Sequence, residues 1–223
     1  MQRAYPNASL LPDDDGVWLL ARSRILDGLA REAIFLIALP DTPDVEPRGW
    51  AFWEQAGQVE WIGPRHTNMG DGSVCAYHPE FDKAWAPGGD LRTLLDLYSV
   101  WALRHLHLAV FDRWAGRQYA MPDEAGRCDP YYRLVQFKPD ELCSCGSDRR
   151  YGQCCRPRDL ELPFLGIRRA FAARNGGQNI LDRAPPNAVL DGMAGGRNAP
   201  PAIVDVHAPL RLHHAAKQRK NRP

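Results

Sequence analysis

The sequence lacks long apolar runs, a leader pattern and an excess of charge of either sign. No stretch of its 223 residues approaches the roughly 18 apolar residues that a membrane-spanning helix needs. The N-terminus has no basic start followed by an apolar segment, which a secretory leader would show. The formal net charge is only +1, with acidic and basic residues interspersed. We therefore expect a cytoplasmic protein whose partners include neither a membrane nor nucleic acid.

Cysteine is also scarce, and its distribution is uneven. Four of the six cysteines fall within residues 143–155, whereas Cys75 and Cys128 stand alone. This pattern does not fit a secreted disulfide framework, and it fits a metal site plus reduced thiols in a reducing compartment. The cysteines therefore divide into a candidate metal cluster and two isolated thiols.

The length predicts one main domain with a small appendage. We expect a polar, flexible lead-in over residues 1–16. The main domain spans residues 17–138, and a cysteine-rich knuckle follows over residues 139–158. Residues 159–223 are predicted to form a short helix and a flexible basic tail, because paired prolines and glycines leave almost no periodic pattern beyond Gly176.

The main domain shows the patterns of an α+β fold. Residues 33–39 are apolar nearly throughout, as a strand covered on both faces would be. Asp27-Gly28 is a turn signal, and the prolines after residue 39 must form a connection because they remove ladder donors. The sequence predicts an antiparallel meander of four strands, at residues 17–25, 33–39, 50–53 and 59–62.

A long amphipathic helix should pack on this sheet. Asp90 is a suitable N-cap, and apolar residues then recur at helical spacing for about 25 residues. His105 and His107 lie within this stretch, but their separation puts them on different faces, so we do not expect them to be ligands. Farther along, residues 132–137 read as a short strand and residues 160–174 as one amphipathic helix.

Cys75 follows a polar loop with a Gly70-Asp71-Gly72 turn signal, so its thiol should lie where a loop ends beside the core. A reachable thiol is suited to carrying an acyl group, because thiolate attacks acyl donors readily and the thioester stays reactive toward amines. Attack by an amine passes through an oxyanion, which a positioned side-chain amide stabilises. Asn68 is our candidate for that amide. Acidic side chains near enough to orient an incoming amine are Asp71, Glu80 and Asp82, and the sequence does not choose among them.

Two other interpretations of Cys75 remain open at this point. Free cysteine is among the most buried residue types, so Cys75 could be a structural core residue. His78 lies three residues farther on and could deprotonate the thiol in a Cys-His hydrolase. No separate Asp or Asn that would orient such a histidine is readable in the sequence.

The order of three short motifs resembles that of ubiquitin-conjugating enzymes. In that family a His-Pro-Asn triplet precedes a Gly-Ser-(Val/Ile)-Cys segment and then Trp-x-Pro, and here HTN, GSVC and WAP follow one another at residues 66–68, 72–75 and 85–87. Thr67 replaces the proline of the triplet. The resemblance covers about residues 17–120, and no amphipathic helix precedes the first predicted strand.

This resemblance implies an activity and partners. It implies that Cys75 accepts a ubiquitin-like modifier as a thioester from a cognate activating enzyme and passes it to an amine. Asn68 would stabilise the oxyanion, and His66 would hold the loop. A catalytically silent domain that docks ubiquitin-like proteins is the alternative within this fold, although such domains normally lack the cysteine.

The second motif is a cluster of four cysteines, Cys143, Cys145, Cys154 and Cys155. Four thiolates so close in sequence suit tetrahedral Zn²⁺, whereas four idle thiols in so polar a segment gain nothing. Since the segment has almost no apolar content, we expect its fold to depend on the metal. The pattern resembles the SEC-C motif, a small zinc-binding module with Cys-x-Cys-Gly-Ser before basic and aromatic residues and a final Cys-Cys. That resemblance implies docking to a protein partner, and its pairing with the first implies a bacterial conjugation pathway.

Overall fold

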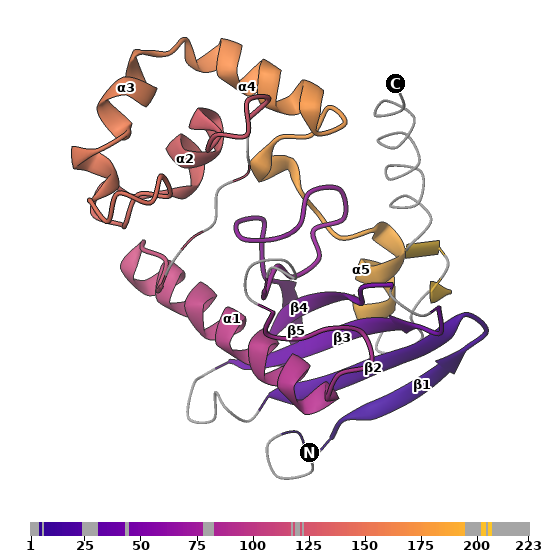
Figure 1. The fold of residues 1–223 in the computed structure, drawn as a ribbon. Coiled ribbons are helices and arrows are strands. Elements are labelled where there is room, and N and C mark those ends of the chain that lie inside the picture. Colours follow the sequence, from indigo (N-terminus) through magenta and orange to yellow (C-terminus); the bar gives the residue numbers. More distant parts are fainter. Residues whose placement is uncertain are drawn as a thin grey trace.

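A five-stranded antiparallel sheet forms the centre of the fold, and its strand order is β1-β2-β3-β4-β5 (Figure 1). The computed structural model describes residues 5, 7–23, 31–42, 45–77, 83–116, 118, 121, 123–194, 202, 203, 205 and 206. The strands are β1 (Ser9–Asp13), β2 (Gly16–Ser23), β3 (Glu32–Pro40), β4 (Arg48–Gln55) and β5 (Gln58–Trp61). The α+β class with an antiparallel meander is confirmed, but the sheet has one strand more than predicted. The Asp27-Gly28 turn lies outside the described residues.

The additional strand is β1, in the segment that was expected to be a flexible lead-in. It pairs with β2 from Ser9 opposite Leu20 to Asp13 opposite Gly16. Pro12 obscured this strand in the sequence, but an edge strand tolerates proline because one side of the ladder needs no donor. Tyr5, just before the strand, is also fixed, since it is 1% exposed and its hydroxyl donates to Asp96 Oδ1 at 2.7 Å.

The long helix α1 (Leu91–Phe111) covers one face of the sheet (Figure 1). Its predicted N-cap is confirmed, because the Asp90 carboxylate accepts a hydrogen bond from the Arg92 amide at 3.0 Å. The helix ends at Asp112, which adopts a left-handed conformation with φ 51°, so it is shorter than predicted. Residues of α1 that pack into this core are Leu94, Leu95, Tyr98, Trp101 and Ala102.

The C-terminal segment covers the other face of the sheet. Helix α5 (Asn187–Ala194) contributes Val189, and the chain farther on contributes Ile203 and Val206. These side chains pack with strand residues that include Trp18, Leu36, Trp50 and Phe52. Strand β3 is therefore buried on both faces, as its apolar composition predicted. The described part of the tail is a structural layer and not the flexible segment that we expected, while the basic end at residues 217–223 lies outside the described residues.

Between α1 and this last layer, the chain builds a second, smaller core. Its elements are α2 (Pro130–Gln136), the 3-10 helix η2 (Tyr151–Gln153), α3 (Arg156–Glu161), α4 (Phe164–Arg174) and the 3-10 helix η3 (Ile180–Asp182). Its buried residues are Tyr131, Tyr132, Phe137, Cys143, Tyr151, Cys155, Phe171 and Ile180. We call this unit the cysteine module. Figure 1 shows α2, α3 and α4 grouped at one side of the sheet layer.

Two predictions in the cysteine module were wrong. Residues 132–136 belong to α2, with Phe137 as its C-cap, and do not form a strand, because Asp129 caps the helix through the Tyr132 amide at 2.9 Å and Pro130 occupies its first turn. Residues 160–174 do not form one helix, since Pro163 separates α3 from α4.

Within the described ranges, no helix is long and apolar enough to cross a membrane.

Candidate thiol site and metal centre

The loop before Cys75 folds back on itself and is anchored to strand β4. Thr67 and Val74 form an antiparallel bridge, and the Asn68 amide donates to the Ser73 carbonyl at 2.7 Å. The Val74 amide donates to the carbonyl of Gly49 in β4 at 2.7 Å. The loop therefore leaves the sheet at a fixed point. Cys75 comes immediately after that point, and its side chain is exposed.

Asn68 lies directly beside the backbone that leads into Cys75. Its side-chain Nδ2 donates to Ser73 Oγ at 3.0 Å and to the Val74 carbonyl at 3.2 Å. The structure thus brings two of the predicted site residues to the same turn. In this conformation both amide N–H groups are directed to the loop itself, so donation to a reacting group requires one of these hydrogen bonds to be exchanged.

Asp71 belongs to the framework of the loop. It is 3% exposed, and its Oδ1 accepts from the Ser73 amide at 3.0 Å and from Ser73 Oγ at 2.8 Å. Its carbonyl accepts from the Trp50 indole at 2.8 Å. A carboxylate buried in this way is not placed to orient an amine arriving from solvent. The other two acidic candidates, Glu80 and Asp82, lie outside the described residues, as does His78.

His66 is packed into an aromatic cluster below the loop. Its ring stacks on Trp114 with centroids 3.6 Å apart, and its carbonyl accepts from the Trp101 indole at 2.8 Å. Its backbone is left-handed, with φ 55°. Burial holds the pKa of His66 well below its ordinary value, so the ring is neutral at physiological pH. The ring and the backbone of His66 thereby anchor this part of the loop in the core.

His105 joins the same cluster from helix α1. Its ring lies 4.2 Å from that of Trp101 and 5.2 Å from that of Trp114, measured between centroids. Burial lowers the pKa of His105 to about 4. The two rings of His66 and His105 meet edge to face at 6.1 Å. His105 is therefore a neutral core residue.

Two residues that were not predicted, Gln178 and Arg183, hold the Cys75 loop from a later part of the chain. Gln178 clamps Gly70, since its Oε1 accepts from the Gly70 amide at 2.8 Å and its Nε2 donates to the Gly70 carbonyl at 3.4 Å. Arg183 donates to the carbonyl of Thr67. Both lie more than a hundred residues after the loop, in a segment without periodicity, so no local signal pointed to them.

Only glycine fits at position 72, where the Cys75 loop touches the backbone of Ala184. A Cβ at Gly72 would lie 2.8 Å from the backbone of Ala184, and the residue has a positive φ of 63°. Both the close approach and the left-handed conformation exclude larger residues. The loop of Cys75 and residues 183–185 are thus packed backbone against backbone.

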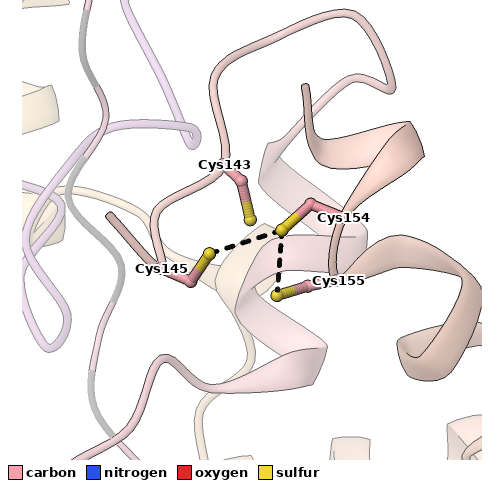
Figure 2. A group of neighbouring side chains, drawn as sticks. All are labelled: Cys143, Cys145, Cys154 and Cys155. Atoms are coloured by element: carbon pink, nitrogen blue, oxygen red, sulfur yellow. Dashed lines mark hydrogen bonds between the residues drawn. The ribbon is translucent and has the colours of Figure 1, made fainter. Parts of the chain in front are cut away.

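The four clustered cysteines form the second part of the site. Their sulfur atoms all lie within 4.8 Å of one another, and Figure 2 shows them facing a common centre. The Cys145 and Cys154 sulfurs are 3.5 Å apart, and those of Cys154 and Cys155 are 3.9 Å apart. This cluster could hold a metal ion. Burial raises the pKa of Cys143, so that thiol favours its protonated form until a metal displaces the proton.

A short hairpin and one helix start bring these sulfurs together. Leu142 and Arg150 form an isolated bridge, and the Cys143 amide donates to the Arg149 carbonyl at 2.8 Å. Cys155 stands at the N-terminal end of α3. The segment is not devoid of a core, contrary to our expectation, because Tyr151 is fully buried and Cys143 and Cys155 share its aromatic cluster.

An ion pair inside the cysteine module joins the hairpin to the helices around it. The guanidinium of Arg133 in α2 contacts Asp159 in α3 with two hydrogen bonds of 2.7 and 2.6 Å, and both side chains are buried. The Tyr151 hydroxyl donates to the same carboxylate at 2.9 Å. A bidentate arrangement with its remaining acceptor satisfied is the geometry in which a buried ion pair is tolerated.

Taken together, the described residues define an α+β protein with an exposed cysteine at the end of an anchored loop and a four-cysteine cluster in a separate small core. Comparison with known protein families, with curated proteins and with solved structures returns no match. Any activity must therefore be argued from the two sites.

Proposed function

We propose that this protein is an acyl carrier that accepts a ubiquitin-like modifier on Cys75 as a thioester and passes it to an amine. The observation that carries the proposal is the placement of an exposed Cys75 immediately after Val74, whose carbonyl accepts from the side-chain Nδ2 of Asn68. The motif order that resembles ubiquitin-conjugating enzymes is consistent with it. A sheet with a helix packed on one face supplies the rigid support that such a loop needs.

The chemistry proceeds in two acyl transfers. The Cys75 thiolate attacks the carbonyl carbon of a donor thioester, the new C–S bond forms, and the donor sulfur leaves as a thiolate. An amine then attacks the same carbonyl, its proton passes to water, and Cys75 leaves as a thiolate. Asn68 would exchange one loop hydrogen bond for the oxyanion of the second step, a contribution of roughly 3 to 4 kcal/mol for a positioned side-chain donor.

The partners follow from this chemistry. A cognate activating enzyme would supply the donor thioester, and a protein substrate would supply the amine. The cysteine module would dock a protein partner, as the SEC-C resemblance implies. A bacterial cytoplasmic setting suits both the thioester and the reduced cysteines.

We also propose that the cluster binds one Zn²⁺ ion through Cys143, Cys145, Cys154 and Cys155. Tetrahedral Zn²⁺ with Zn–S distances of about 2.3 Å sets its sulfur atoms about 3.8 Å apart. The separations of 3.5 and 3.9 Å are close to that value. In this role the ion supplies structural cross-linking and no chemistry to Cys75.

The test uses a chemical donor, so that neither the modifier nor its activating enzyme has to be known. A peptide ending in Gly-Gly, presented as a sulfonatoethyl thioester, is mixed with the full chain in which Cys128→Ser removes the other isolated thiol. We expect an acyl adduct on Cys75 that reducing thiols remove, and aminolysis when lysine is added. Cys75→Ala in the same background should form no adduct. Rapid release of free acid without any amine would indicate a hydrolase instead and would overturn the proposal.

A further inference from the structure

Arg183 is a buried cation beneath the Cys75 loop. Arg183 is only 4% exposed. Nε donates to the Ile180 carbonyl at 2.7 Å, and Nη1 donates to the Thr67 carbonyl. Nη2 is buried and has no hydrogen-bond partner among the described residues. The guanidinium thus retains unused donor capacity at the loop.

Arg183 differs from Arg133 and Arg174 in how its charge is compensated. The buried Arg133 is paired with Asp159, and the partly buried Arg174 is paired with Asp129. In the described part of the chain, no carboxylate forms an ion pair with Arg183. Arginine stays protonated in proteins, and an uncompensated buried charge is costly. A buried cation without such a partner stabilises any anion beside it, so Arg183 is a candidate for a functional role.

The position of Arg183 points to Cys75 as that anion. Arg183 bonds to Thr67, which pairs across the loop with Val74, the residue before Cys75. Its neighbour Ala184 packs against Gly72 in the same loop. Burial lowers the pKa of Arg183, while the nearby Tyr132 of α2 and Cys75 act in the opposite direction. The titratable groups that interact with the thiol include Arg183, Tyr132 and, from α1, Tyr98. The same loop also carries the buried Asp71, which is paired with Arg48 of β4 at 3.9 Å.

We infer that Arg183 is a positioning residue that stabilises the thiolate of Cys75 through its charge while it holds the loop at Thr67. This inference rests on the proposed function in so far as Cys75 is the reacting group. A larger thiolate fraction near neutral pH speeds attack on the donor thioester. The two tyrosines are neutral at that pH and Arg48 is paired with Asp71, so Arg183 is the cation of this set that has no carboxylate partner among the described residues.

The test compares two substitutions that differ chiefly in charge. Arg183→Lys and Arg183→Gln both shorten the side chain and keep a donor, but only lysine keeps the positive charge. Alkylation of Cys75 by iodoacetamide is followed against pH by peptide mass spectrometry, in the full chain carrying Cys128→Ser. We expect Arg183→Gln to raise the alkylation midpoint by about half to one pH unit, and Arg183→Lys to leave it near that of the parent. Gln178→Ala is the matched control, because it removes the Gly70 clamp without changing charge, and it should not shift the midpoint.

Three results would overturn the inference. The first is an equal midpoint for the Lys and Gln variants when thermal melts show that both are folded. The second is a shift in Gln178→Ala as large as that in Arg183→Gln, because loop position would then explain the effect. The third is a parent midpoint at or above the ordinary cysteine value of about 8.5, which decides the matter even if Arg183→Gln does not fold. Because alkylation needs no modifier, a failure to load the peptide thioester leaves this test unaffected, and the reverse also holds.

Discussion

The side-chain amide of Asn68 donates to two groups of its own loop. It could therefore support the loop, stabilise the oxyanion, or do both, and a substitution can distinguish these roles. If it acts on the oxyanion, Asn68→Ala should leave acyl loading of Cys75 nearly intact and slow aminolysis by about 100-fold or more. Both steps can be measured with the peptide thioester described above, first without and then with lysine.

Ser73→Ala is the control for this experiment. It removes the hydroxyl that accepts from Asn68 at 3.0 Å but leaves the amide in place. We expect it to affect aminolysis far less than Asn68→Ala does. Equal loss of loading and aminolysis in Asn68→Ala would mean that Asn68 only stabilises the conformation of the loop.

His105 gives the fold a pH dependence whose sign follows from its burial. Its pKa is lowered to about 4 in the folded chain from an ordinary 6.5, so the unfolded chain binds more protons between these values. The free energy of unfolding should therefore fall as pH falls through this window, by about 2 kcal/mol between pH 7 and pH 5 for this one residue. The lowered pKa of His66 acts in the same direction.

Denaturant melts at several pH values test this prediction. His105→Phe should remove much of the loss between pH 7 and pH 5, because phenylalanine fits an aromatic cluster and does not titrate. His107→Gln, on the same helix but outside that cluster, should keep the parent slope. A parent stability that is flat over this range would contradict the burial of a neutral His105.

Single site residues could be predicted from the sequence where reactive side chains lie close together in a recognisable motif order. The motif order led to Cys75 and Asn68, which the loop does bring to one turn. It could not lead to Gln178 or Arg183, because their contacts with Gly70 and Thr67 join positions far apart in the chain. The burial of Asp71 was equally unreadable, since a Gly-Asp-Gly turn usually lies on the surface.

Among the elements, the cysteine hairpin is the one whose stability should depend on a ligand. We expect one Zn²⁺ per chain by elemental analysis, and a chelator or Cys145→Ser should lower the melting temperature of the cysteine module. Unfolding of the module should be incomplete, because Tyr151 and the Arg133–Asp159 pair contribute a core that does not need the metal.

Far-ultraviolet circular dichroism before and after chelation measures this difference. Most helical signal should remain, while the melting transition moves to lower temperature. Cys128→Ser is the matched control, since Cys128 bonds to the Ser144 carbonyl at 3.3 Å but does not belong to the four-cysteine cluster. A preparation that contains no zinc would contradict the proposed metal site.

Strands and helices with strong periodic patterns were predicted well, and those governed by a single residue were not. The apolar residues of β2 and the apolar run of β3 identified both strands. Residues 132–137 carry two aromatic side chains and Val135, which are typical of a strand, yet Asp129 and Pro130 start the helix α2 here. Strand β1 was missed because proline was weighed without regard to the edge position it could occupy.

For the molecule as a whole, the main question is whether the cysteine module and the Cys75 loop are independent. Met69, next to Asn68, packs against the core of the cysteine module. Gln178 and Arg183, which follow α4 in the chain, hold the same loop. The loop of Cys75 is therefore supported by the sheet on one side and by the cysteine module on the other.

This arrangement predicts that metal removal reaches Cys75. A chelator should change the rate of Cys75 alkylation at neutral pH by about twofold or more, toward slower reaction if Arg183 is released from the loop. Site-resolved mass spectrometry distinguishes Cys75 from the newly exposed cluster cysteines. An unchanged rate at Cys75 would indicate that the two units are uncoupled and that the cysteine module serves only for docking.

The layer formed by α5, Ile203 and Val206 could not be foreseen from composition. Its segment is rich in proline and glycine, and its apolar residues occur only in short runs such as 188–190 and 202–204. The buried face of β3 did require a cover on each side, so the existence of a second layer was implied by that strand even though its source was not.

The central claim, that Cys75 carries an acyl group, is tested most directly by the intact mass of the protein isolated from its own cells. The parent chain should carry an adduct on Cys75 that reducing thiols remove. Cys75→Ser should hold the same mass as a thiol-resistant ester, and Cys75→Ala should hold none. An adduct that persists unchanged in Cys75→Ala would contradict the account.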